Sequence, residues 1–126
     1  MKIFYQTAGK LIMLCLLPLL MTGCDHVSFS QDVSPILEQN CLECHRAGGS
    51  GLQASGFSME TYDDLMQGTN FGPMIIAGDS QGSNMLVLME GRADPSISMP
   101  HGQQDPISKQ DIQTIRLWID QGAKNN

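Results

Sequence analysis

Hydrophobic positions recur at helical spacing in several parts of the chain, and no segment alternates with the period of two that a β-strand shows. Three of these segments also carry signals for where a helix begins or ends. These signals are a proline that the first turn of a helix accepts, serines that can cap a helix, and glycines that can end one. Together, pattern and boundaries predict helices over residues 32–41, 59–67 and 84–90.

A fourth helix is predicted after Ser108, where the boundary signals are fullest. Ser108 can cap the helix, and Asp111 stands at the third helical position, as in a capping box. Trp118 lies on the apolar side of the predicted helix, and Gly122 stands where a C-terminal stop belongs. This helix is the best defined of the four.

Two segments have little periodicity. Residues 46–56 contain four glycines and are predicted to form a loop, and residues 93–106 contain three prolines and are predicted to be irregular but constrained. The fold class predicted is all-α. Four short helices bury little apolar area against a chain-entropy cost of roughly 1.5 kcal/mol per ordered residue, so we expect a bound group to complete the core.

The first 23 residues have the order of an export signal. Lys2 and Lys10 flank a short polar start, an apolar run over residues 11–21 follows, and small residues close it. That run is shorter than the roughly 20 residues that a membrane-spanning helix needs, and Pro18 interrupts it. We therefore predict a cleaved signal peptide over residues 1–23.

Residues 21–24, Met-Thr-Gly-Cys, resemble the bacterial lipobox, in which cleavage precedes a cysteine whose sulfur takes a lipid. The resemblance implies that Cys24 is lipidated and anchors the chain to a membrane, since each buried methylene adds about 0.8 kcal/mol. Residues 24–31 would then be a lipidated N-terminus and linker. The implied location is the periplasmic side of a bacterial envelope, and Asp25 favours the outer leaflet of the inner membrane.

The net charge of the chain limits the classes of partner that it can bind. The chain of 126 residues has 13 acidic residues against 7 Lys and Arg, a formal net charge of -6, and removal of the signal would take away two lysines and no acid. A nucleic-acid binder needs clustered cations to replace counterions, so that class is excluded. A surface this acidic favours a redox partner protein with a basic docking patch.

Residues 41–45, Cys-Leu-Glu-Cys-His, form the C-x-x-C-H motif of covalent c-type haem. Two thiols three positions apart can each add to one vinyl group of a porphyrin, and the adjacent imidazole then lies beneath the iron. The alternatives are a redox disulfide, which expects a βαβ pattern, and half of a zinc site, which needs a second ligand pair. We predict one haem c bound through Cys41, Cys44 and His45.

The motif and several later segments resemble the small monohaem c-type cytochrome domain of planctomycete-type cytochrome proteins. The resemblance covers nearly all of the mature chain, and implies a cytochrome c-like domain over residues 32–126 with about four short helices around one covalent haem. It implies His45 as the proximal iron ligand and Met99 as the distal one. The later segments are residues 75–79, 83–86, 98–100 and 117–123.

For the sixth iron ligand, chemistry alone leaves more than one candidate. Met99 follows His45 by 54 positions and lies in the proline-rich loop, which can reach the second haem face. A thioether opposite histidine raises the reduction potential toward that of cytochromes c. His101 is the main alternative and would give a bis-histidine haem of lower potential. The further candidates are Met74, Met85 and Met89.

Two functions follow from such a haem. The first is electron transfer by a six-coordinate haem, either in a free carrier or in a subunit of a larger oxidoreductase. The second is a five-coordinate or bis-histidine haem in a gas sensor or a peroxidase-like enzyme, for which His101 would be the nearby acid–base group. Because the sequence places no Ser-His-Asp or paired-carboxylate arrangement together, we expect an electron carrier and not an enzyme.

Overall fold

Helices and irregular segments make up the part of the chain that the computed structural model describes, residues 26–102 and 105–126. No strand occurs within these residues, and their one β-bridge joins Thr69 to Gly72. The predicted all-α class is confirmed. The helical elements are η1 (Phe29–Val33), α1 (Ser34–Asn40), α2 (Ser50–Ser55), α3 (Tyr62–Gln67), α4 (Asn84–Met89), η2 (Pro95–Ile97) and α5 (Lys109–Asp120).

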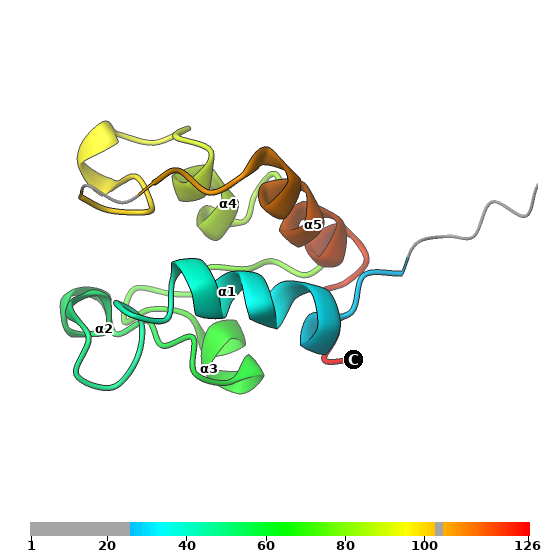
Figure 1. The fold of residues 1–126 in the computed structure, drawn as a ribbon, viewed down its shortest axis with the longest axis horizontal. Helices are drawn as coiled ribbons and strands as arrows, with labels where there is room; N and C mark the ends of the chain where they lie inside the picture. Colours follow the sequence, from blue (N-terminus) through cyan, green and yellow to red (C-terminus); the bar gives the residue numbers. More distant parts are fainter. Residues whose placement is uncertain (1–25, 103–104) are drawn as a thin grey trace, which may run out of the picture.

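The helices lie in two layers (Figure 1). One layer holds α4 and α5, and the other holds α1, α2 and α3. The short π-helix η1 leads directly into α1 and packs against α5, which connects the layers at the end where both described termini lie. None of the helices in residues 26–102 and 105–126 is long and apolar enough to cross a membrane.

The predicted boundaries of α5 are confirmed. The Ser108 hydroxyl accepts a hydrogen bond from the backbone N–H of Asp111 at 3.0 Å, which satisfies one of the free donors at the start of the helix. Gly122 follows the helix with φ 102°, a conformation that favours glycine. Trp118 is buried, and its indole N–H donates to the Lys124 carbonyl.

The other three predicted helices occur with changed ends. The first is divided into η1 and α1, and Pro35 lies in the first turn of α1 as predicted. The second, α3, begins later than predicted, because Thr61 and not Ser58 caps it by accepting from Asp64 N–H. The third, α4, has Ser83 at its N-cap, but no side-chain capping bond is made there.

Residues 46–56 were predicted to be a loop, and the structure places α2 within them. This helix buries none of its residues, so core packing does not explain it. Its ends are set by backbone bonds: Leu52 N–H donates to the Cys44 carbonyl, and Gly56, with φ 72°, closes the helix by donating to the Leu52 carbonyl. A glycine-rich composition predicts a loop and gives no indication of these backbone contacts.

Residues 26–31, predicted as part of a linker, are instead packed onto the domain. Val27 is buried, and its N–H donates to the side chain of Gln121. The Asn126 carbonyl accepts from the Ser28 hydroxyl and from the Ser30 N–H. The order of this segment therefore comes from contacts with the far end of the chain. The signal peptide predicted for residues 1–23 and the lipidated Cys24 lie outside the described residues.

The hydrophobic core lies between the two layers and extends from η1 to α4. Its largest member is Trp118, whose ring packs near Phe29 and Tyr62, with ring centroids 5.5 and 6.4 Å away. Partly buried side chains, among them Met74 and Met89, surround the core. The buried members are Val27, Val33, Leu37, Phe57, Leu65, Ile75, Met85, Leu86, Ile115, Trp118, Ile119 and Ala123.

We predict that Ser83→Ala lowers the free energy of unfolding by about 1–3 kcal/mol, because it leaves buried polar groups unsatisfied. Ser83 is fully buried, and its hydroxyl donates to the Asp79 carbonyl at 2.7 Å and accepts from Ile76 N–H at 2.9 Å. Urea denaturation measures the loss, with Ser96→Ala, at an exposed position, as the control. Equal stability of the two variants would contradict the role given to Ser83.

Candidate functional site

The C-x-x-C-H motif begins where α1 ends. Cys41 is the C-cap of α1, and its N–H donates to the Leu37 carbonyl. The Cys41 carbonyl then accepts from the N–H groups of Cys44 and His45, at 3.1 and 3.0 Å. These two bonds fold the motif into one turn, so that both thiols and the imidazole come from a single compact piece of backbone.

The two thiols of the motif are half-buried and form no disulfide. Burial, with a smaller contribution from neighbouring Cys44, raises the pKa of Cys41 to about 11. Cys41 is therefore a neutral thiol at physiological pH. Reactive cysteines of redox disulfides have lowered pKa values, so this environment does not favour the thioredoxin-type alternative.

His45 is buried, with 8% of its surface exposed, and its ring has a fixed orientation. Nδ1 lies 2.9 Å from the Phe57 carbonyl oxygen. A carbonyl only accepts, so Nδ1 carries the proton and donates, and the lone pair of the neutral ring is on Nε2. Such a bond from the far ring nitrogen is the usual support of a metal-binding histidine, because it fixes the tautomer and increases the basicity of the ligand.

The segment after the motif folds back around His45. The His45 carbonyl accepts from Met59 N–H at 2.8 Å, and the Phe57 ring packs edge-on to the imidazole with centroids 5.4 Å apart. On another side, Gly51 of α2 approaches the ring so closely that a Cβ there would lie 2.8 Å from Cε1. Neither Phe57 nor Gly51 was predicted as a site residue. The glycine content of residues 46–56 was the available signal, and it predicted only a loop.

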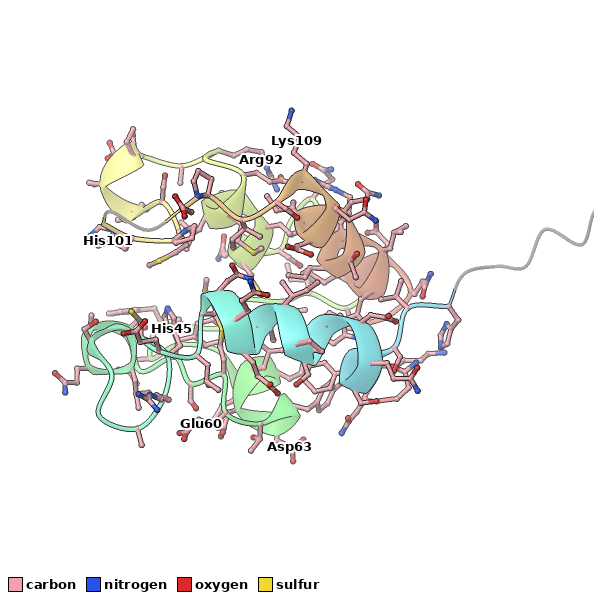
Figure 2. All side chains as sticks on the ribbon, viewed as in Figure 1. His45, Glu60, Asp63, Arg92, His101 and Lys109 are labelled. Atoms are coloured by element: carbon pink, nitrogen blue, oxygen red, sulfur yellow. The ribbon has the colours of Figure 1, made fainter. Side chains whose placement is uncertain are left out.

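The two candidates for the sixth ligand lie on the loop after η2, in the other layer. Met99 is half-buried, and its N–H donates to the Leu88 carbonyl at 3.2 Å, which ties the loop to α4. His101 is exposed. Figure 2 shows His45 and His101 on the same side of the molecule, each on its own layer. The structure therefore brings the loop that carries both candidates to the side of the molecule that holds His45.

An ion-pair network lies at the C-terminal end of α4, ahead of η2 and the loop that carries Met99. Glu90 pairs with Arg92 at 2.7 Å and also with Arg116 of α5. Arg92 also donates to the Gln81 carbonyl, and Arg116 donates to the Ser80 hydroxyl. Since Glu90 directly follows α4, the network fixes α4 to α5 immediately before the segment that leads to Met99.

The remaining candidates lie in or beside the core. Met85 is buried, and Met74 and Met89 pack against the core. Within residues 26–102 and 105–126, no three His, Cys, Asp or Glu side chains gather as the ligands of a metal ion would. The described residues thus assemble no zinc site around the Cys41 and Cys44 pair.

The donor set suits a covalently held haem. Two unpaired thiols and an imidazole with a free Nε2 lone pair come from one turn, and a half-buried thioether lies on a loop held from the other layer. Thiol, imidazole and thioether are the groups that fix and ligate haem in cytochromes c. By its chemistry this set fits haem better than a hard cation, which prefers oxygen ligands.

Comparison with known proteins identifies one family. Residues 41–102, which run from the first cysteine of the motif to just beyond Met99 and His101, match the family described as Planctomycete cytochrome C. No curated protein and no solved structure matches the chain.

Proposed function

Because the chain carries a cytochrome c-type domain, we propose that it is a monohaem electron carrier of the bacterial envelope. The observation that supports this most is the turn of residues 41–45, in which two free thiols adjoin a histidine whose Nδ1 is already bonded to a carbonyl. A haem c bound there would supply one-electron ferric/ferrous chemistry. The protein's part is to fix the ligands, exclude water and dock a partner.

We assign Cys41 and Cys44 to the two thioether bonds and His45 to the proximal iron position. The Phe57 carbonyl, by accepting from Nδ1–H, fixes the ring orientation and the tautomer in which the Nε2 lone pair is available to iron. The burial of His45 limits competition by water. The same three residues would therefore both attach the cofactor and set its orientation.

We assign Met99 to the distal iron position. Its half-buried side chain and the backbone bond to Leu88 support it over His101, which is exposed. A methionine opposite a histidine stabilises ferrous iron and raises the potential, as an electron carrier requires when its partners work in the cytochrome c range. Two strong protein ligands would also leave no open position for a substrate, which is why we propose a carrier and not a catalyst.

The docking partner is proposed to be a redox protein with a basic patch. Arg92 and Arg116 both pair with one carboxylate, that of Glu90. These two cations therefore do not pair with the other acidic side chains of the surface. Glu60 and Asp63 lie exposed on the outer side of the lower layer in Figure 2. Complementary charge of this kind increases association rates at low ionic strength. The membrane attachment proposed is the lipid on Cys24.

Purification of the full chain from a bacterium that matures c-type haem tests the proposal. We expect one haem per chain that stays with the polypeptide in alkaline pyridine, and a low-spin spectrum in both oxidation states. We also expect no reaction with carbon monoxide in the reduced state. Ready binding of carbon monoxide would instead support the gas sensor or peroxidase-like alternative, and a chain without haem would contradict the proposed function.

A further inference from the structure

Gly51 makes the closest approach of any described glycine to the proposed proximal ligand. A Cβ built on Gly51 would lie 2.8 Å from Cε1 of His45, 2.9 Å from Nε2, and 3.0 Å from the Cys44 carbonyl oxygen. Contacts below 3.0 Å are essentially never seen for real Cβ atoms. Residue 51 can therefore lie this close to Cε1 and Nε2 of the imidazole only because it has no side chain.

Backbone conformation does not account for this glycine. Gly51 is the second residue of α2, and its φ lies outside the left-handed region. Its backbone conformation is therefore one that any residue can adopt. What opposes a side chain at this position is the contact of the added Cβ with the imidazole, the closest of its contacts, and with the Cys44 carbonyl oxygen.

The imidazole has little freedom to move away from an added methyl group. His45 is buried, its Nδ1 is held by the Phe57 carbonyl at 2.9 Å, and the Phe57 ring packs against it. A ring displaced from Gly51 would distort the Nδ1 hydrogen bond. The cost of the methyl group would therefore appear in the position and basicity of the ligand as well as in stability.

We propose that Gly51 is a positioning residue for the haem iron: by lacking a side chain, it leaves the Nε2 edge of His45 in place to bind the metal. This inference rests on the proposed function, since it concerns the same His45. It adds a residue to the site that lies six positions beyond the haem motif and bears no chemical group of its own.

Gly51→Ala tests the proposal, and Gly49→Ala is its matched control. Gly49 is the N-cap of α2 and also lies outside the left-handed region, but the atoms nearest its added Cβ are backbone atoms, with the Cys44 carbonyl oxygen at 2.3 Å. In both variants the added Cβ meets the Cys44 carbonyl oxygen. Only in Gly51→Ala does it also lie less than 3.0 Å from atoms of the imidazole. The difference between them reports the effect on His45.

Both holoproteins should be compared with the unmodified one by redox titration, ferric electron paramagnetic resonance and thermal denaturation. We expect Gly51→Ala to raise the potential, because a displaced imidazole donates less to ferric iron, and to change the low-spin ferric signal. The expected change is at least tenfold in the ratio of reduced to oxidised haem at a fixed potential, which is about 59 mV for one electron. Gly49→Ala should lose thermal stability, because its added Cβ meets the Cys44 carbonyl, and should change the potential and the ferric signal less than Gly51→Ala does.

The remaining outcomes separate this inference from the proposed function. Equal potentials for Gly51→Ala and the unmodified protein would overturn the role of Gly51, and so would equal changes in both variants, which would place the effect in the backbone. Haem present in Gly49→Ala but missing in Gly51→Ala would support the role, whereas haem missing in both would overturn it. If the unmodified chain itself binds no haem, the proposed function fails as well.

Discussion

Serine in place of both Cys41 and Cys44 is expected to leave the purified chain without covalently bound haem. A thioether forms when the S–H group adds across a vinyl double bond, with sulfur bonding to one carbon and hydrogen to the other, so no oxidant is consumed. A serine hydroxyl does not undergo this addition under the same conditions. Haem extraction with acidified organic solvent, followed by absorption spectra of the polypeptide, measures the loss, which we expect to be complete.

The matched control for this experiment is Glu43→Gln, an exposed spacer position within the same turn. It should retain the full amount of covalent haem, because position 43 contributes neither a thiol nor a ligand. Haem that resists extraction from the double serine variant would show that attachment does not occur through Cys41 and Cys44. The free state and half-buried location of both thiols agree with the attachment we expect.

Met99→Ala is expected to lower the reduction potential and to open a coordination position on the iron. Axial ligands tune haem potentials over about 0.8 V, and loss of a thioether removes the ligand that favours ferrous iron. We expect the ferric sulfur-to-iron charge-transfer band to disappear completely and carbon monoxide to bind the reduced protein. Redox titration and absorption spectra measure these changes.

His101→Ala is the control for Met99→Ala, because His101 lies two positions away on the same loop and is exposed. It should keep the charge-transfer band and the potential of the unmodified protein. The reverse result, in which His101→Ala alone changes the spectrum, would assign the sixth position to His101. The haem would then be bis-histidine, of lower potential, and the assignment of Met99 would be wrong.

Local sequence signals were sufficient to predict a helix whose ends are set by residues within its own first and last turns. The boundaries of α5 follow from the Ser108 cap and from Gly122, and both act within one helical turn. The haem motif is likewise a local pattern, and the family match supports the cytochrome c-type domain that it indicated. The assignment of the individual ligands remains a prediction, since no observation tests it.

Contacts made outside the hydrogen-bond pattern of a regular helix explain what the sequence analysis missed. The helix α2 lies in a segment whose glycines suggested a loop, and it is held by a hydrogen bond from Leu52 to Cys44 and by the close packing of Gly51 on His45. The cap position of Ser83 was predicted, but its hydroxyl binds Asp79 and Ile76 in a buried turn. Such partners are chosen by tertiary structure, and helix propensity carries no information about them.

The packing of Val27 and Ser30 against the C-terminal residues bears on how the protein would sit at a membrane. Asn126 receives hydrogen bonds from residues 28–30, so folded structure begins close to position 26. With the lipid on Cys24, as proposed, two residues of chain reach at most about 7 Å, and the domain would rest against the headgroups without a tether. Figures 1 and 2 place His45 at the end away from the described termini. The cofactor would therefore face the periplasmic water, and its partner would approach from that side without competing with the bilayer for the same surface.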